Sequence, residues 1–208
     1  MTILTPIQSV INLTKAMQDK DKFSYINVPK SSIVGLSKNS DNSFPSHFAK
    51  NILASLKNSD KKVMKAVSHT LIPEIEANKH FKIGLNKNDQ YYYSNVFEYY
   101  YLNNKEVYNS IMEFFIKNSK TVTVSFHDKK LVQKHLGYNT HVISVPFGSH
   151  YDRLDSVYAQ LSEFDGGVDY CMLDCGVFGL ALMTKIWNNL NMSIIDLGKT
   201  INLYKTSL

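Results

Sequence analysis

A regular alternation of strand and helix patterns over residues 81–208 constrains the fold more than any other feature. Short runs rich in apolar and β-branched residues, typical of buried strands, are separated by stretches with apolar residues at helical spacing. The predicted strands are residues 81–85, 121–126, 141–145, 168–173 and 193–195, and the predicted helices are 105–117, 129–135, 154–164 and 177–190. This alternation predicts an α/β fold, a single Rossmann-like domain with a mostly parallel sheet and helices on both faces.

Residues 1–80 show a less regular pattern. We expect a helix over 7–17, a short strand over 23–28, a turn over 29–32, and helices over 45–56 and 61–77, the last interrupted at Pro73. This part is predicted to be mainly helical and to cover part of the β/α region that follows. A chain of 208 residues is long enough for one substantial core but short for two, so a single domain over 1–208 is expected.

The composition is that of a soluble globular protein, with 44% hydrophobic and 20% charged residues and no apolar run long enough to cross a bilayer. Residues 1–9 lack the basic region and small-residue cleavage site of a secretory signal, so a cytoplasmic protein without membrane contact is expected. Cys171 and Cys175 have no matching Cys or His pair at zinc-finger spacing, which makes a structural zinc site unexpected. The pattern specifies no oligomeric state.

The charge balance favours anionic partners, since the formal net charge is +5 and the pI is about 9.0. The positive charges are spread in short pairs such as Lys61-Lys62 and Lys129-Lys130, so they permit nucleic-acid binding without defining a site. Abundant Lys, Asn, Ile and Tyr beside a single Arg are typical of an AT-rich coding genome. This composition is consistent with a phage or low-GC bacterial source, and a phage protein would act in the host cytoplasm.

Polar residues follow each predicted strand, at the edge of an open α/β sheet where ligands bind. These segments are residues 27–31, 127–128, 147–153, 174–176 and 196–199. Gly176 and Gly179 open a helix after a strand, where free backbone N–H groups and the helix dipole can receive a phosphate. The dinucleotide-binding glycine fingerprint is absent from the sequence, and close helix-to-strand packing explains such a glycine pair equally well.

The segment 143–153 runs from an apolar strand into a polar loop that holds the only arginine of the chain, Arg153. A guanidinium fork matches the oxygens of phosphate or carboxylate, so Arg153 indicates an anion site. His150 and Asp152 beside it are candidates for a general base, with Asp174 and Asp196 as second candidates. The alternatives are that Arg153 is a surface residue that caps a helix or pairs with Asp155, that Asp152 caps the helix near Leu154, and that His150 is an ordinary loop histidine.

The carboxyl-terminal half resembles the GT-D-type glycosyltransferases. The resemblance rests on residues 142–146, 169–176 and 194–199, and the family's glycine turn, Asp-x-Gly and following Tyr match Gly176, Asp196, Gly198 and Tyr204. It implies a Rossmann-like transferase that uses a nucleotide sugar, with a UDP-sugar as the first expectation. The residues then expected to bind the donor are Asn27, Lys30, Ser31, Phe147, Gly148, Arg153, Asp174, Gly176 and Asp196.

One departure from the family bears on metal binding. Near their amino terminus these enzymes carry an Asp-x-Glu pair that holds a divalent metal against the nucleotide diphosphate. The matching positions here are Val28 and Lys30, so a divalent metal is doubtful and no metal ligands are predicted. Lys30 and Arg153 could take over the electrostatic role of the metal, unless Lys30 is only a solvated turn residue.

Two tyrosine triplets, residues 91–93 and 99–101, form an unusual aromatic cluster. Tyrosine rings stack on sugars and on bases extruded from a duplex, although about half of such residues would ordinarily belong to the core. Tyr91, Tyr92, Tyr93 and Tyr99 are the predicted acceptor-binding residues.

With the basic pI and the phage-like composition, these tyrosines favour DNA as the acceptor, with glucose or arabinose transferred to a hydroxymethylated cytosine. Two alternatives remain open. One is a glycosyltransferase acting on a protein-linked or polysaccharide glycan. The other is a non-catalytic protein that binds nucleotides or nucleic acid.

Overall fold

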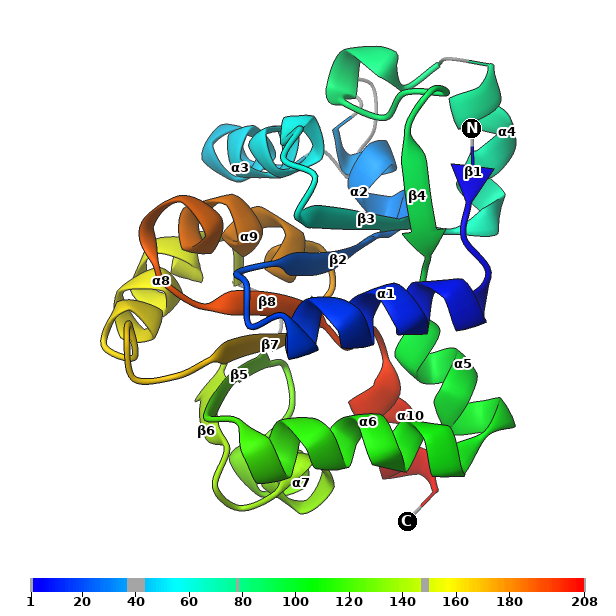
Figure 1. The fold of residues 1–208 in the computed structure, drawn as a ribbon. Coiled ribbons are helices and arrows are strands. Elements are labelled where there is room, and N and C mark those ends of the chain that lie inside the picture. The colour runs from blue at the N-terminus through cyan, green and yellow to red at the C-terminus, as the bar shows by residue number, and fades with distance from the viewer. Residues whose placement is uncertain (1, 37–43, 78, 147–149, 208) are drawn as a thin grey trace.

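One parallel sheet organises the computed structural model, which describes residues 2–36, 44–77, 79–146 and 150–207 (Figure 1). Eight strands of these residues form it in the order β1-β4-β3-β2-β8-β7-β5-β6, and every neighbouring pair with an assigned register is parallel. The strands are β1 (Thr2–Ile3), β2 (Ser24–Val28), β3 (Val63–Val67), β4 (Gln90–Tyr93), β5 (Thr121–Ser125), β6 (His141–Ser144), β7 (Tyr170–Asp174) and β8 (Ser193–Asp196). The predicted α/β class is confirmed.

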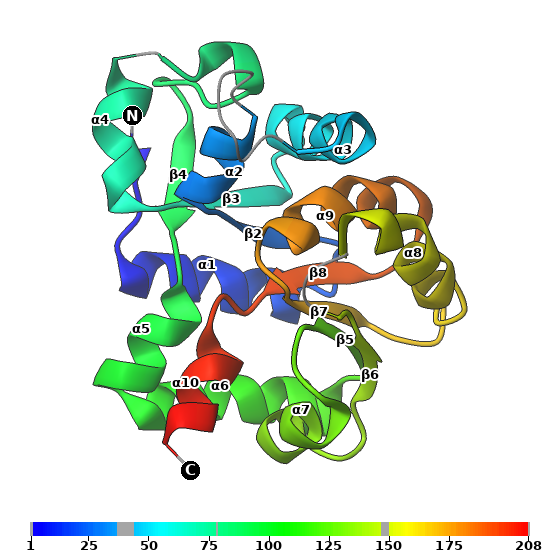
Figure 2. The same ribbon diagram turned by 180° about the vertical axis from the view of Figure 1, so that it is seen from behind.

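Helices cover both faces of this sheet (Figures 1 and 2). They are α1 (Pro6–Gln18), α2 (Lys30–Gly35), α3 (Ser46–Lys57), α4 (Ile72–Glu76), α5 (Val96–Asn103), α6 (Lys105–Asn118), α7 (Lys129–Leu136), α8 (Leu154–Ser162), α9 (Val177–Asn189) and α10 (Thr200–Thr206). Short 3-10 turns lie at His69–Leu71, Phe81–Ile83 and His150–Arg153. None of the helices among the described residues is both long enough and apolar enough to traverse a lipid bilayer.

Two apolar cores lie on opposite sides of the sheet. One is built from α3, α8 and α9 and includes Phe48 and Phe178, and the other is built from α1, α5, α6, α7 and α10 and includes Phe97. All five residues of each of β2, β5 and β7 are buried, as expected for strands of a parallel sheet that is covered on both faces.

The predicted elements of residues 105–208 are confirmed, with shifts of one or two residues at their ends. Three expectations closer to the amino terminus are wrong. The turn expected over 29–32 is absent, because α2 begins at Lys30. Residues 61–77 contain strand β3, a 3-10 turn and the short α4 in place of one broken helix. Residues 81–85 contain the 3-10 turn Phe81–Ile83 in place of the expected strand, and the next strand along the chain is β4.

The physical reason is that β3 is covered on both faces. Four of its five residues are buried, so its apolar run shows no alternation that would distinguish a strand from a helix. Its one polar side chain, Lys65, donates to the backbone oxygens of Leu56 and Gly84. Residues 1–80 therefore contribute β1, β2 and β3 to the sheet and are less helical than predicted.

The connections out of the central strands diverge to opposite faces. The chain leaves β2 and β7 toward α3 and α9 in one core, whereas it leaves β8 and β5 toward α10 and α7 in the other. Adjacent strands in the order β2-β8-β7-β5 thus send their loops to alternate sides. Such switch points open a crevice beyond the carboxyl ends of the strands, where ligands bind in open α/β sheets.

Candidate functional site

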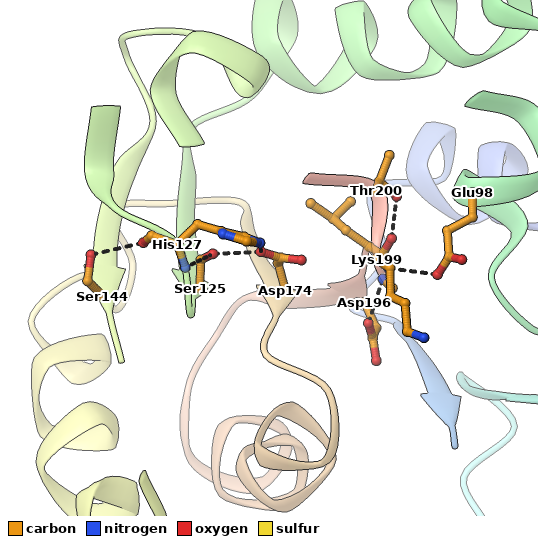
Figure 3. A network of polar contacts seen from close by, with 10 residues as sticks. Glu98, Ser125, His127, Ser144, Asp174, Asp196, Lys199 and Thr200 are labelled. Atoms are coloured by element: carbon orange, nitrogen blue, oxygen red, sulfur yellow. Dashed lines mark hydrogen bonds and ion pairs between the residues drawn. The ribbon is translucent and has the colours of Figure 1, made fainter. Parts of the chain in front are cut away.

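A cleft of about 620 Å³ lies at these switch points, beyond the carboxyl ends of β2, β8, β7 and β5. Segments far apart in the chain form its wall. The polar side chains on this wall include Asn27, Asn95, His127, Asp174 and Asp196. Figure 3 shows that Asp174 and Asp196 lie at the ends of neighbouring strands, with His127 beside the former and Lys199 beside the latter.

Asp196 organises one side of the cleft through hydrogen bonds to the backbone. Its Oδ1 accepts the Gly198 N–H at 2.9 Å and its Oδ2 accepts the Asn27 N–H at 3.2 Å. The Asn27 side chain extends this link, because its Oδ1 accepts the N–H of Asn95 at 2.8 Å. Burial raises the pKa of Asp196 to about 6, against the lowering effect of these hydrogen bonds. The ends of β2 and β8 and the start of α5 are thereby held together.

Asp174 lies at the end of β7, where its side chain is buried with 6% of the residue exposed. Its Oδ2 accepts the Ser125 hydroxyl at 2.6 Å, and the Nε2 of His127 lies 3.8 Å from the same oxygen, beyond hydrogen-bond range. Burial raises the pKa of Asp174 to about 7, while the Ser125 hydrogen bond opposes this and the nearby Asp196 and Glu98 add to it. A carboxyl group that titrates near neutral pH is suited to acid–base chemistry.

His127 follows β5 and is positioned by its own backbone. Its N–H donates to the Ser125 hydroxyl at 3.0 Å, and its carbonyl oxygen accepts the Ser144 hydroxyl at 3.4 Å (Figure 3). Burial lowers the pKa of His127, and the positive charge of Lys205 lowers it further. The imidazole is therefore held more in its neutral form than a free histidine would be.

The turn after β8 brings Glu98 against the cleft. The Lys199 N–H donates to Glu98 Oε1 at 2.7 Å, and burial raises the pKa of Glu98. Gly198 has a φ of 64° in this turn, and a Cβ there would lie 2.5 Å from Glu98 Oε1. Only glycine fits this position without displacing Glu98.

Positive side chains line the same cleft. They are Lys30 at the start of α2, Lys199 in the turn after β8, and Lys205 on α10. The Lys30 ammonium lies 3.3 Å from Glu74 Oε1, and the other carboxylate oxygen of Glu74 lies 2.6 Å from His80 Nε2. Hydrogen bonds from His80 and Lys30 lower the pKa of Glu74.

The amino terminus of α9 also reaches the cleft. Gly176, its N-cap residue, lines the wall with a φ of 54°. Gly179, one turn further, packs closely on β7, because an added Cβ would lie 3.2 Å from Leu173 and 3.3 Å from the Cys175 sulfur. Close packing thus explains Gly179, whereas Gly176 lies where a helix terminus can receive an anion.

No family model matches this sequence, and no curated protein matches it. Solved structures match over almost the whole chain. Two are described as structures of domain of unknown function 1792, one in selenomethionine-substituted form and one as having "a distinct glycosyltransferase fold". Each is 13% identical to this chain, and their TM-scores are 0.70 and 0.71 respectively. Both alignments cover 100% of this chain and 81% of the matched chain. A third, described as a new glycosyltransferase of that domain from Streptococcus sanguinis, is 12% identical with a TM-score of 0.71 and coverage of 99% and 84%.

The chain has a glycosyltransferase-type fold. At this level of identity the likeness concerns the fold, and it agrees with the GT-D-type pattern of the sequence.

Within this glycosyltransferase-type fold, five of the residues predicted to bind a donor line the one cleft. They are Asn27, Lys30, Asp174, Gly176 and Asp196. Glu98, Asn95 and Lys205 also lie in or next to the cleft but are not predicted from the sequence, and His127 and Lys199 are predicted only as positions in loops that follow strands. The available signal for His127 and Lys199 was their position just after a predicted strand. Glu98 and Lys205 gave no such signal, because the helices that carry them, α5 and α10, were not predicted.

Asp152 and Arg153, in the 3-10 turn before α8, are exposed and do not line the cleft. Tyr151, just before them in the chain, packs on Phe44 and Phe48. Arg153 is the N-cap residue of α8 without a side-chain capping bond. Asp155 pairs with Lys185 at 2.9 Å.

Three other predicted residues are placed as follows. Ser31 is exposed on α2 and does not line the cleft. His150 begins the 3-10 turn, and its side chain lies outside the described part of the structure. Phe147 and Gly148 lie outside the described residues.

The tyrosines predicted to bind an acceptor fall into two groups. Tyr91 is fully buried and its hydroxyl bonds to the backbone of Asn86, so its ring has no free face for a ligand. Tyr92 is partly buried and packs edge-on against Tyr25. Tyr93 and Tyr99 contact each other with ring centres 5.8 Å apart, and Tyr99 is 38% exposed. Tyr93 and Tyr99 alone of the four form a partly exposed aromatic pair, and they flank the cleft residues Ser94 and Asn95 in the sequence.

The cleft residues fit a phosphate-containing ligand better than a divalent metal. Val28, which is expected from the sequence to replace the first metal-binding carboxylate of the resembled family, is buried with 1% of the residue exposed. Both oxygens of Asp196 already accept backbone N–H groups. Among the residues that the structure describes, no group of three or more His, Cys, Asp or Glu side chains is arranged to hold a metal ion.

Proposed function

We propose that this protein is a glycosyltransferase that binds a nucleotide-sugar donor, a UDP-sugar in the first instance, in the cleft at the ends of β2, β8, β7 and β5. One observation carries the proposal: in a glycosyltransferase-type fold, the buried carboxyl group of Asp174 lies in a cleft that three lysines line. Such a cleft combines charge compensation for a diphosphate with a group that can exchange a proton near neutral pH.

The donor would lie across the switch point. Its diphosphate would contact Lys30 and Lys199 and approach the amino terminus of α9 at Gly176. Its nucleoside would lie against the polar wall of Asn27 and Asn95, whose hydrogen bonds hold β2, β8 and α5 in place. Asp196 supports this wall from behind.

Asp174 is the proposed general base. The carboxylate takes the proton of the acceptor hydroxyl while the acceptor oxygen bonds to the anomeric carbon of the sugar. The bond between that carbon and the diphosphate oxygen breaks, and its electron pair leaves with the nucleoside diphosphate. We prefer Asp174 over Asp152 and His150 because Asp174 lines the cleft, whereas Asp152 is exposed outside it.

DNA that contains hydroxymethylated cytosine is the proposed acceptor, with glucose or arabinose transferred. Support comes from the net charge of +5, from the lysines at the cleft, and from the Tyr93–Tyr99 pair, which flanks the cleft residues Ser94 and Asn95 in the sequence. An extruded base could stack on the exposed ring of Tyr99. Binding to DNA that falls steeply with salt would separate this acceptor from a glycan or protein.

The test is mass spectrometry of nucleosides digested from hydroxymethylcytosine DNA after incubation with the protein and a panel of nucleotide sugars. A hexose or pentose mass shift is expected with the wild-type protein, and at least a hundred-fold less product with Asp174→Asn, in line with the loss of a general base. Asp152→Asn is the matched control, because it makes the same change outside the cleft, and it should retain full activity.

Three other outcomes would change the proposed base, the proposed acceptor or the proposed activity. Loss of product in Asp152→Asn with full activity in Asp174→Asn would move the base to the loop before α8. Donor hydrolysis without a mass shift would move the acceptor to a glycan or protein. Absence of any turnover, together with nucleotide binding, would indicate a non-catalytic binding protein.

A further inference from the structure

We propose that the cleft compensates the charge of the donor diphosphate with the ammonium groups of Lys30, Lys199 and Lys205, without a divalent metal ion. This inference rests on the proposed function, since it concerns how the same site would hold a nucleotide sugar. It follows from the side chains that surround the end of β2 and from the way the nearby carboxylates are already bonded.

The end of β2 offers no oxygen ligands from its side chains after Asn27. Val28 is buried and aliphatic, Pro29 has a ring, and Lys30 carries a positive charge that repels a metal cation. Mg²⁺ requires several oxygen ligands in near-octahedral geometry, and protein sites supply one or two carboxylates for it. This strand end therefore lacks the chemistry of a metal site.

The remaining carboxylates near the cleft are engaged with the protein. Both oxygens of Asp196 accept backbone N–H groups, and one oxygen of Glu98 accepts the N–H of Lys199. One oxygen of Asp174 accepts the Ser125 hydroxyl. A metal chelated by both oxygens of any one of these carboxylates would compete with a bond that the carboxylate already makes to the protein. The raised pKa values of Asp174, about 7, and of Asp196, about 6, also leave these two groups partly protonated near neutral pH, which weakens them as ligands.

The three lysines reach the cleft from three separate elements. Lys30 begins α2, Lys199 lies in the turn after β8, and Lys205 lies on α10, and all three line the cleft wall. The charge of Lys205 acts within the cleft, because it lowers the pKa of His127. Charges fixed around the leaving group stabilise the electron pair that it takes when the glycosidic bond breaks.

Glu74 keeps the first of these lysines in place. Its carboxylate lies 3.3 Å from the Lys30 ammonium, and His80 holds the other carboxylate oxygen at 2.6 Å. The Lys30 side chain is 54% exposed, and ion pairs of this kind are weak, so the ammonium can turn from Glu74 to a phosphate when the donor binds. Glu74 is thus a positioning residue for Lys30.

The test is isothermal titration calorimetry of UDP with the full-length protein, in EDTA and separately in Mn²⁺. We expect the same affinity within about two-fold in both buffers, since no bound metal contributes. Lys30→Met, Lys199→Met and Lys205→Met should each weaken UDP binding by roughly ten-fold, as the loss of a charge-assisted hydrogen bond does. Lys30→Arg should restore most of the affinity.

Lys61→Met is the matched control. Lys61 is exposed just before the amino end of β3, whereas the cleft lies beyond the carboxyl ends of the strands. The Lys61→Met variant should therefore bind UDP like the wild-type protein. Thermal melting of each variant checks that it is folded. Binding that requires Mn²⁺, or wild-type affinity in all three cleft variants, would overturn the lysine proposal and leave the proposed function standing. Absence of UDP binding in both buffers would overturn the proposed function and this inference together.

Discussion

At the scale of single residues, two buried carboxyl groups contribute to the pH dependence of the stability of this protein. Burial raises the pKa of Asp174 to about 7 and that of Asp196 to about 6, from an ordinary value of 3.8. The folded state therefore holds these protons at pH values where the unfolded chain has released them. Because these two groups bind fewer protons in the unfolded state between about pH 4 and pH 7, their contribution to the free energy of unfolding falls as the pH rises through that window.

Asp174→Asn removes the larger of these two effects. Asparagine is uncharged at every pH and its oxygen can still accept the Ser125 hydroxyl. The variant should be more stable than the wild type at pH 8, by on the order of 2 kcal/mol, and nearly equal to it at pH 4. Urea unfolding at pH 4, 6 and 8 measures this difference. A variant that is less stable than wild type at pH 8 would show that the Asp174 carboxylate is a net stabilising group.

At the scale of elements, the turn from β8 into α10 decides whether Lys199 and Lys205 reach the cleft. Gly198 makes this turn with a φ of 64° and lies directly against Glu98, which accepts the N–H of Lys199. A side chain at this position would push Glu98 away and shift α10. The placement of two of the three proposed phosphate-binding lysines therefore depends on one glycine.

Gly198→Ala should destabilise the fold by roughly 2–3 kcal/mol and weaken UDP binding, because it adds a steric clash to the backbone strain. Gly166→Ala is the matched control. Gly166 also has a positive φ, of 71°, but a Cβ there would meet no atom within 4 Å, so only the strain of about 1 kcal/mol is expected. Urea unfolding and UDP titration of both variants measure the difference. Equal stability losses would mean that the contact with Glu98 adds nothing.

The elements themselves differ in how well their local sequence predicts them. Helices α6, α8 and α9 were predicted because they place apolar residues at helical spacing against a core. β3 was misread because it is buried on both faces, and the tyrosine-rich stretch was not resolved into elements. That stretch forms β4 and α5. The chain changes direction between them at Asn95, which has a left-handed backbone conformation with a φ of 56°. Nothing in the tyrosine composition marks that break.

At the scale of the whole molecule, one sheet joins two cores. Phe48 of α3 and Phe97 of α5 are both almost completely buried, on opposite sides of the sheet. Because both cores pack against the same sheet, loss of packing on either face should weaken one cooperative unit.

Phe48→Ala and Phe97→Ala test this cooperativity. Each should lower the free energy of unfolding by roughly 3–5 kcal/mol, the usual cost of deleting a buried phenyl ring. Each variant should still unfold in a single transition, monitored in parallel by circular dichroism and tyrosine fluorescence. Two separate transitions in either variant would mean that the cores fold independently.

The sequence by itself determined the α/β class and most elements of residues 105–208, because strand and helix periodicities are local properties of the chain. It also indicated Asn27, Lys30, Asp174, Gly176 and Asp196, since the carboxyl ends of parallel strands meet at one edge of a sheet.

Only the tertiary structure decided that Lys205 lines this cleft and that Glu98 accepts the N–H of the cleft residue Lys199. It likewise decided that Tyr91 is buried and that Asp152 and Arg153 do not line the cleft. It also decided the pKa of Asp174, which depends on burial and on Ser125, 49 positions away in the chain. The burial of a side chain and its distance from a partner group depend on contacts between segments remote in sequence, and no local sequence pattern encodes them.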